Sequence, residues 1–333
     1  MAQPTSAITR WDLALNYSQF SLAYNRMGFV GLAIFPIIMV GEQAANFLKV
    51  KISSLLGPVE DLKRAPKAEY KTADFEFDTD SYKTDDHGAE EVLDDRMLKI
   101  YRNLLRAEII HRNRAVNRVL QSYESEAITA AQSTSNFNNA AASVLWSTAA
   151  TATPIQDFQA AIEAVEGRVG RTPDQATIGK KALRKLKLCA QITDRIKYDG
   201  FHDATLTDPT ALRALADLFE LKKLNVAGGN GGGFKNTAGE GDTPTLTRFW
   251  DATKTLVHCS DDAGGDLEAP LARIGNTLCW SEESAGVNDG EMALIVEEYR
   301  DDKTRGSRLR ARGDWTLKLL HTDAGQLITS CIS

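Results

Sequence analysis

The sequence DDRMLKIYRNLLRAEIIHRNRAVNRVLQSYESEAITA spans residues 94–130 and lies within residues 89–153, a stretch that contains neither glycine nor proline. Its apolar side chains recur at steps of three, four or seven residues, which places them on one face of an α-helix. These side chains are Leu98, Tyr101, Leu105, Ile109, Val116, Leu120 and Tyr123. The pattern predicts a single helix, roughly 55 Å long at about 1.5 Å per residue.

A helix of this length exceeds what an ordinary globular core needs, since globular helices average about 11 to 12 residues. We therefore expect a strut, with a coiled coil or a helical bundle as the alternatives. The strut is favoured over the coiled coil because Arg112 and Asn113 interrupt the apolar stripe, so that no strict heptad repeat continues.

The composition is ordinary for a protein with one large or two medium domains: 333 residues, of which 43% are apolar and 25% charged. The 39 Lys and Arg residues against 45 Asp and Glu residues give a formal charge of −6. This charge provides no electrostatic attraction for a phosphate backbone, so a direct nucleic-acid ligand is not expected.

The four cysteines, Cys189, Cys259, Cys279 and Cys331, are far apart and form no Cys-x-x-Cys pair. Neither a zinc site nor a disulfide framework is indicated, and we expect buried free thiols in a reducing compartment. The apolar run GFVGLAIFPIIMV at residues 28–40 is too short to span a bilayer and contains a proline. It is expected to form a buried strand, and no membrane partner is predicted.

The N-terminal quarter contains two extensions that a small domain cannot easily cover. Residues 1–27 form an amphipathic arm whose aromatic side chains so short a segment cannot shield. Residues 41–72 form a long hairpin-like excursion around Gly57-Pro58, which should lie on something, such as a neighbouring copy, because an isolated hairpin is marginal in water. A mobile surface loop is the alternative.

The segment that follows the hairpin leads into the long helix. Phe75 and Phe77 alternate with acidic residues, which predicts a half-buried strand. The next acidic residues are expected at the N-terminus of the long helix, where its dipole favours them. They are Asp85, Asp86, Glu90 and Glu91.

From residue 154 onward the pattern alternates between helices and short strands. Helices are predicted at residues 155–166, 180–187 and 209–219, and strands at residues 176–178, 223–226 and 255–258. The last part predicts strands at residues 293–299, 309–320 and 327–332. The fold class is therefore α+β, without an internal repeat.

None of the motifs that could carry chemistry is complete. The glycine-rich run 228–233 is followed by Phe234 where a phosphate-binding loop needs Lys or Gly, so a flexible loop is predicted. Cys279, His321 and Asp323 lack the flanking residues of a nucleophile turn. Two acidic groups lack an established metal-ligand spacing. They are Asp85, Asp86 and His87, and Asp261, Asp262, Asp266 and Glu268.

The densest basic cluster is expected in a charged loop or a subunit contact, and it consists of Arg305, Arg308, Arg310 and Arg312. We therefore predict no catalytic residue, no cofactor-binding residue and no metal ligand. A chain of this length without a cluster of such residues is often structural.

Several short motifs occur in a fixed order along the chain. They are LAIFPIIMV at 32–40, RAP at 64–66, the long helix, Trp146 followed by TPIQD at 153–157, GRTP at 170–173, Ile178-Gly179, DRIKY at 194–198, Phe249-Trp250, and VEEYRD at 296–301. Over most of the chain this order resembles the tailed-phage major capsid protein family, whose Hong Kong phage-type fold is shared with encapsulins.

The resemblance implies an α+β fold with five regions. Residues 1–40 would be an N-terminal arm and entry strand, and residues 41–73 an extended E-loop. Residues 74–140 would form a P-domain with a long spine helix. Residues 141–290 would form an A-domain, and residues 291–333 would be P-domain strands that return to it.

The resemblance also implies a non-enzymatic structural protein without cofactors. Its copies would form hexamers and pentamers of an icosahedral shell that encloses DNA without sequence-specific binding, in a virion assembled in the bacterial cytoplasm. A separate scaffolding protein, a portal and decoration proteins are the other implied partners.

Some family members join subunits by an isopeptide bond between Lys and Asn. The hairpin offers five lysines, but residues 300–314, the expected P-domain loop, contain no Asn, so no such cross-link is predicted.

Two other functions remain open from the sequence. One is an encapsulin-type compartment with a protein cargo, which shares the same fold. The other is an α+β enzyme whose glycine-rich run 228–233 closes over a phosphorylated ligand.

Overall fold

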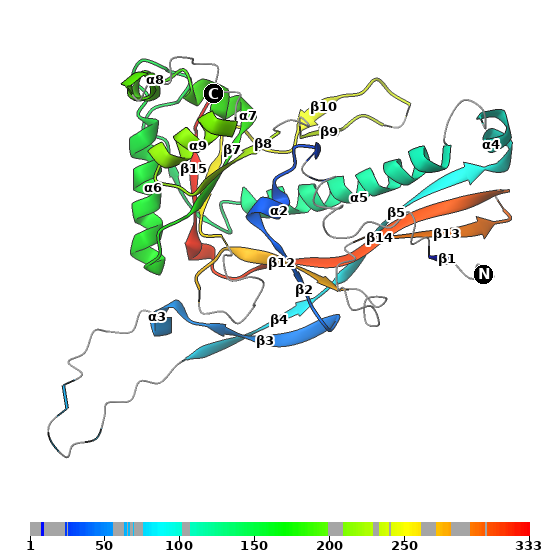
Figure 1. Cartoon of the computed structure of the whole chain (residues 1–333), viewed down its shortest axis with the longest axis horizontal. Helices are drawn as coiled ribbons and strands as arrows, with labels where there is room; N and C mark the ends of the chain where they lie inside the picture. The colour runs from blue at the N-terminus through cyan, green and yellow to red at the C-terminus, as the bar shows by residue number, and fades with distance from the viewer. Residues whose placement is uncertain are drawn as a thin grey trace.

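The computed structural model describes residues 8–9, 24, 26–55, 63–64, 66, 69, 76–101, 107–198, 209–228, 233–239, 241–260, 271–280, 294–303 and 305–333. The molecule is elongated, and two sheets follow one another along its length (Figure 1). A five-stranded sheet with helices α6 to α9 occupies one end, and a six-stranded sheet with helix α5 along it extends to the other.

The six-stranded sheet is built around β14 (Gly306–Leu319). Its first half pairs antiparallel with both β13 (Ile295–Asp301) and β5 (Asp85–Asp94), and its second half pairs antiparallel with β12 (Gly275–Trp280). The sheet is completed by β2 (Ile37–Met39), parallel to β12, and by β1 (Ile8–Thr9), antiparallel to β13. The strands predicted at residues 293–299 and 309–320 are thus confirmed as β13 and β14, with shifted limits.

The long helix is observed as α4 (Asp95–Tyr101) and α5 (Ala107–Ala131), and residues 102–106 lie outside the described part. Its C-terminal half follows the predicted stripe, because Val116, Leu120 and Tyr123 are buried. Ile109, earlier on the same stripe, is 41% exposed. The predicted surface strut is therefore confirmed for α5, which packs on the sheet mainly through its second half.

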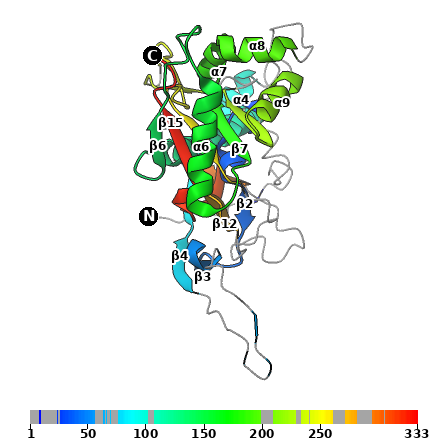
Figure 2. The same cartoon turned by 90° about the vertical axis from the view of Figure 1, so that its left-hand side faces the viewer.

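The five-stranded sheet has the order β6 (Asn138–Ala141), β15 (Gly325–Thr329), β11 (Thr255–His258), β7 (Gln175–Gly179) and β8 (Lys223–Ala227). Its helices are α6 (Pro154–Val169), α7 (Lys180–Leu186), α8 (Ala190–Tyr198) and α9 (Pro209–Leu218), and Figure 2 shows α6 crossing in front of β15 and β7. Every helix and strand predicted in this region is present, and only α8 and β6 were not predicted.

Two hydrophobic clusters account for this arrangement. One packs α6, α7 and α9 on one face of the five-stranded sheet, through residues such as Phe158, Ile178 and Val257. The other cluster joins the opposite face to α5 and the six-stranded sheet, through residues such as Leu256 and Leu120. All four cysteines are free and buried, as predicted.

Two N-terminal predictions are wrong. The run 28–40 is not one strand but a helical turn, α2 (Gly31–Ile34), followed by β2. A side chain at Gly31 would meet the Cβ atom of Ala127 in α5 at 2.8 Å, so glycine allows the turn to approach α5 closely. The acidic residues 85–91 lie in strand β5, which pairs with β14, rather than at a helix N-terminus, and Glu90 among them contacts Arg308 and Arg310 of β14.

The outgoing strand of the excursion predicted at residues 41–72 is confirmed as β3 (Ala44–Val50), but it pairs antiparallel with β4 (Phe77–Lys83), which lies after the predicted excursion. The helical turn α3 (Ile52–Leu55) follows β3, and the turn at Gly57-Pro58 lies outside the described residues. β4 is a strand as expected, but Phe77 is 51% exposed, and the more covered face of the strand is that of Asp80 and Tyr82. Among the described residues, no helix combines the length and the apolar character needed to cross a bilayer.

Candidate assembly surface

The β3–β4 hairpin is attached to the six-stranded sheet through one of its two faces. Antiparallel pairing places Phe47 opposite Asp80, so both side chains point to the same side. Lys318 of β14 donates a hydrogen bond to Asp80 at 2.6 Å and lies 6.0 Å from the centre of the Phe47 ring. Phe47 is only 7% exposed. This inner face therefore anchors the hairpin to its own subunit.

The outer face of the same hairpin is partly apolar, and its charged residue is Lys83 at the base, opposite Ala44. Leu48 stands opposite Thr79, and Val50 stands opposite Phe77. Leu48 is 45% exposed and Phe77 is 51% exposed. A two-stranded sheet with apolar side chains open to solvent on one face is a typical contact surface, because burial of that face by another molecule is favourable.

The N-terminal arm is described only at residues 8–9, 24, 26 and 27, and the rest lies outside the described part of the chain. Strand β1 extends the sheet at β13 with Ile8 opposite Glu298. Tyr24 is completely buried against Phe29 and Tyr123 of its own chain. The arm does not shield Tyr24 by itself, as expected, but α5 of the same chain covers this ring, so Tyr24 needs no neighbouring copy.

Glu124 of α5 holds the end of this arm. Its carboxylate accepts hydrogen bonds from the Tyr24 hydroxyl and from the backbone N–H groups of Val30, at 3.0 Å, and Gly31, at 2.9 Å. Burial raises the pKa of Glu124, and these three hydrogen bonds act in the opposite direction. The sequence analysis missed this residue. The available signal was an acidic residue one helical turn after Leu120, on the apolar face of the helix.

The basic cluster forms an ion-pair network within the six-stranded sheet. Arg308 contacts Asp301 at 2.7 Å and Glu90 at 3.3 Å, and Arg310 and Arg312 both contact Glu297. These hydrogen bonds lower the pKa of Glu297 against the raising effect of burial. The prediction of a charged loop is wrong for residues 306–312, which are part of β14.

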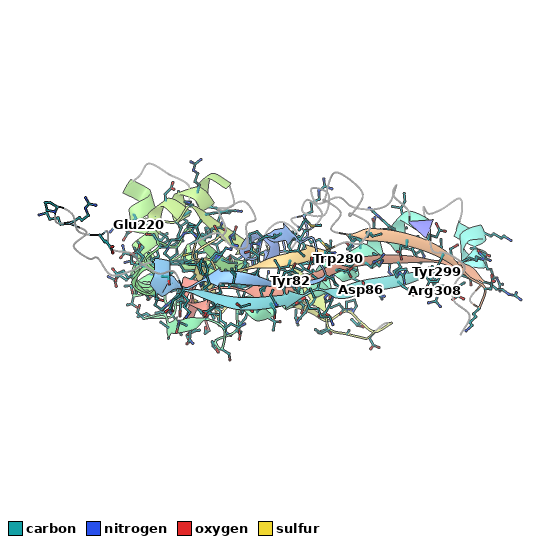
Figure 3. All side chains as sticks on the ribbon, turned by 90° about the horizontal axis from the view of Figure 1, so that it is seen from below. Tyr82, Asp86, Glu220, Trp280, Tyr299 and Arg308 are labelled. Atoms are coloured by element: carbon teal, nitrogen blue, oxygen red, sulfur yellow. The ribbon has the colours of Figure 1, made fainter. Side chains whose placement is uncertain are left out.

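The turn between β13 and β14 is much shorter than the loop expected at residues 300–314. It comprises residues 302–305, since β13 ends at Asp301 and β14 begins at Gly306. Figure 3 shows Tyr299 and Arg308 near this end of the molecule, far from Glu220 in the five-stranded region. The strands β5, β13 and β14 thus remain paired almost to this end of the molecule.

The glycine-rich run is described only at its two ends, Gly228 and Gly233. The N–H of Gly228 donates to the carbonyl of Gly28 at 2.9 Å, and that of Gly233 donates to the carbonyl of Met27 at 3.2 Å. Gly233 has φ +56, and a side chain there would approach Gly228 Cα to 2.9 Å. The ends of this run therefore serve backbone packing, and the predicted loop itself lies outside the described residues.

A second hairpin projects beyond this run. It consists of β9 (Phe234–Asn236) and β10 (Leu246–Arg248), which pair only with each other among the described strands. Leu246 is 62% exposed, and the Arg248 guanidinium covers the Phe234 ring at 4.5 Å. This hairpin is a further surface with exposed apolar side chains.

The residues tested for chemistry lie in environments that do not support it. Burial raises the pKa of Cys279 to about 12 and lowers that of His321 to about 4. The Cys279 thiol therefore stays protonated near neutral pH. The Asp323 carboxylate accepts a hydrogen bond from Asn138 at 3.2 Å. His87 stacks on Trp315 at 4.1 Å. The described residues contain no cluster of three or more potential metal ligands, and the residues 261, 262, 266 and 268 lie outside them.

No family model matches the sequence. The major capsid protein of Burkholderia phage BcepMu is 24% identical over 182 residues, which are 55% of this chain and 52% of that protein. The chain thus spans about half the length of this curated relative.

The similarity to solved structures covers nearly the whole chain. A phage-related protein of Bordetella bronchiseptica RB50 is 17% identical with a TM-score of 0.67, over 98% of this chain and 99% of that one. The capsid structure of Cyanophage P-SCSP1u is 12% identical with a TM-score of 0.51, over 100% of this chain and 91% of that one. The chain has the fold of tailed-phage major capsid proteins.

The tailed-phage capsid fold explains why the chain is elongated rather than compact. Its long helix and narrow sheet extend away from the five-stranded region, so a large part of the subunit surface lies on slender elements (Figure 1). The α+β class predicted from the pattern of helices and strands is confirmed, and so is the resemblance to the tailed-phage capsid fold.

Proposed function

We propose that this chain is the major capsid protein of a tailed bacteriophage, whose copies assemble into an icosahedral shell around the DNA genome. The proposal is supported by the capsid fold and by the relative in phage BcepMu. The observation that carries it is the β3–β4 hairpin, whose inner face is anchored by Lys318 while its outer face exposes Leu48 and Phe77. Burial of such a face by a neighbouring copy would repeat at every subunit, and many modest contacts make a closed shell stable.

The same proposal assigns the regions expected from the sequence. The E-loop, expected at residues 41–73, would begin with β3, and β4 would close its base. The spine helix would be α5, and the A-domain would contain β7, β8 and β11 of the five-stranded sheet. Copies would form hexamers and pentamers in the virion, after assembly in the bacterial cytoplasm. The formal charge of −6 suits a container, because a wall that does not bind phosphate strongly allows DNA to be packed and released.

The proposed subunit is non-enzymatic and uses no cofactor. A separate scaffolding protein, a portal and decoration proteins would complete the particle. An isopeptide cross-link is not part of the proposal, because the sequence 300–314 offers no Asn.

Assembly can be tested by expressing the full chain, alone and with the structural genes next to it, and examining the product by electron microscopy and sedimentation velocity. We expect shells from the unchanged chain. The double variant Leu48→Asp/Phe77→Asp should give only small species, because two carboxylates would be buried at each contact.

Leu188→Asp is the matched control, since Leu188 is 63% exposed and lies outside the hairpin. Its yield of shells should stay close to that of the unchanged chain. A chain that remains monomeric under every condition would contradict the proposal. Shells of normal yield from the hairpin variant would refute the role given to its outer face.

A further inference from the structure

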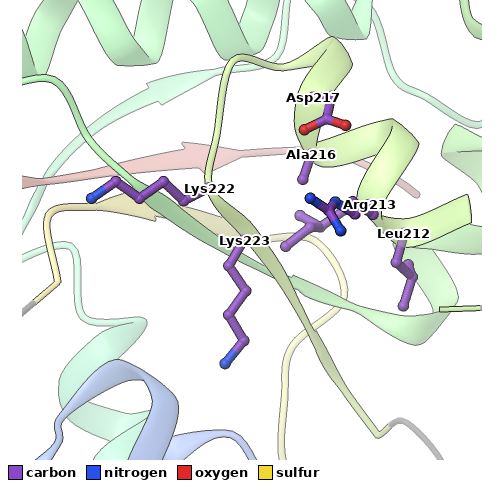
Figure 4. A pocket seen from close by; sticks show the side chains of 7 residues that line it. Leu212, Arg213, Ala216, Asp217, Lys222 and Lys223 are labelled. Atoms are coloured by element: carbon purple, nitrogen blue, oxygen red, sulfur yellow. The ribbon is translucent and has the colours of Figure 1, made fainter. Parts of the chain in front are cut away.

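The outer edge of the five-stranded sheet carries an open groove between β8 and α9 (Figure 4). Its volume is about 510 Å³. The groove is lined by Leu212, Arg213, Ala216, Asp217, Lys222, Lys223 and Leu224. The apolar side chains form part of its wall, and the charged ones can meet a ligand from both the strand and the helix.

Strand β8 is the last strand of its sheet, so among the described strands its outer edge has no partner. The N–H of Lys223 donates toward β7, to the carbonyl of Asp174 at 3.2 Å. Backbone groups alternate in direction along a strand, so those of Leu224 and Val226 point to the outer edge. The edge can therefore accept the hydrogen bonds of an added strand.

The groove is a local positive region on a chain of formal charge −6. Arg213, Lys222 and Lys223 contribute three positive charges, and Asp217 contributes one negative charge. Lys222 lies 3.9 Å from Asp174, but this carboxylate already accepts hydrogen bonds from the N–H and hydroxyl of Ser260 at 2.7 and 2.6 Å. The side chain of Lys222 is 70% exposed and can also reach a ligand.

We propose that this groove binds an extended, acidic peptide segment of a separate protein, which adds as a strand to the outer edge of β8. Main-chain hydrogen bonds would supply affinity, and the three cations would select carboxylates on the peptide. A symmetric contact between the β8 edges of two copies is disfavoured, because it would bring the same cations together. The proposal does not depend on shell formation.

Fluorescence anisotropy with a labelled alternating Glu/Val octapeptide tests this site on the full chain. Four further peptides separate the contributions: an alternating Lys/Val octapeptide, an octa-Glu peptide, and two Glu/Val octapeptides N-methylated at every second residue, one at the Glu positions and the other at the Val positions. We expect binding of the Glu/Val peptide, weaker binding of octa-Glu, and loss of binding on N-methylation in one of the two registers.

Reversal of two charges, Arg213→Glu/Lys223→Glu, should weaken binding of the Glu/Val peptide by about tenfold, because each exposed ion pair contributes only modestly to affinity. Arg184→Glu/Lys185→Glu on α7 is the control, because it makes the same change in charge at exposed residues elsewhere. Unchanged melting temperatures would show that both variants fold.

Four results would overturn the proposal. They are no binding of the Glu/Val peptide, equal binding of the Lys/Val peptide, an equal effect of the two charge reversals, and full binding of both N-methylated registers. Sedimentation without peptide tests the alternative occupant of the groove, which is a second copy of this chain. If the groove variant alone changes the self-association of the chain, the groove is a contact between copies and not a peptide site.

Discussion

The five-stranded region and the β3–β4 hairpin use similar side chains in opposite ways. In the first, Phe158 is fully buried and stacks on Phe219, with 4.1 Å between ring centres. In the second, Phe77 is half exposed on the outer face of a two-stranded sheet. A buried aromatic ring contributes to the stability of its own subunit, whereas an exposed one can contribute only when another molecule covers it.

This difference separates folding from association within one chain. The five-stranded region has apolar clusters on both faces of its sheet and needs no partner to bury them. The hairpin is held to its subunit through Phe47, Lys318 and Asp80 on one face only. Variants in the first region should therefore change the free energy of unfolding, and variants on the outer face of the hairpin should change assembly.

The largest expected effect is on unfolding. Phe158→Ala should lower the free energy of unfolding by about 3 to 5 kcal/mol, because it opens a cavity between Trp146 and Phe219. Phe77→Ala should change it by less than about 0.5 kcal/mol. Urea denaturation of the unassembled chain measures both. Equal losses for the two variants would remove the distinction between the regions.

Glu124→Ala should cost about 3 kcal/mol, somewhat less than the loss of Phe158. It leaves the Tyr24 hydroxyl and two buried N–H groups without their acceptor. Glu124→Gln keeps one acceptor oxygen and should lose less. If urea denaturation shows no loss for Glu124→Ala, then Glu124 does not hold the end of the arm.

Acid should destabilise the five-stranded region through His258 in β11. Burial lowers the pKa of His258 to about 4, below its ordinary value of 6.5. The unfolded chain then binds the proton first, so stability is full above about pH 6.5 and falls by roughly 3 kcal/mol as the pH approaches 4. Thermal melts between pH 7 and 4 measure this, and His258→Asn should show a flatter profile.

Asp314 in β14 should change the pH dependence of stability in the direction opposite to that of His258. Burial and the facing Asp86 raise the pKa of its carboxyl, so its contribution to stability grows as the pH falls. Asp314→Asn should therefore be more stable than the unchanged chain at pH 7 and lose this advantage in acid. A variant that is less stable at pH 7 would contradict this assignment.

The smallest effect is expected for Lys318→Met, which removes the ion pair to Asp80 at the inner face of the hairpin. Unfolding should change by less than about 1 kcal/mol, because the pair is partly exposed. Hydrogen exchange of β3 and β4 should nevertheless become faster, since local opening needs fewer broken contacts. Unchanged exchange would show that Phe47 alone anchors the hairpin.

Helix α5 and most of the elements after residue 154 could be predicted from the sequence because each buries a face with its own period. The elements α8, β9, β10 and β12 were not predicted. The stripe of α5 and the apolar cores of β7, β8 and β11 appear where the pattern predicted them. The acidic strand β5 could not be recognised in this way. Its charges suggested a helix N-terminus, and only the register of β5 against β14 brings Glu90 to Arg308 and Arg310.

The candidate surface was predicted less completely than the fold. Residues 41–72 indicated a hairpin that needs a support, but nothing in the sequence showed that Lys318, more than 230 residues from Asp80, would anchor it. The burial of Tyr24 was missed for the same reason. Its cover comes from Glu124 and Tyr123 on a distant helix, and sequence spacing does not report such contacts.

The sequence alone determined the α+β class, the long helix and most of the alternating elements after residue 154, because these depend on local periods of apolar residues. The tertiary structure decided which faces are covered by the chain itself. It buries one side of the β3–β4 hairpin and leaves Leu48 and Phe77 on the other side open. Burial depends on contacts between residues far apart in the chain, and a local pattern cannot specify them.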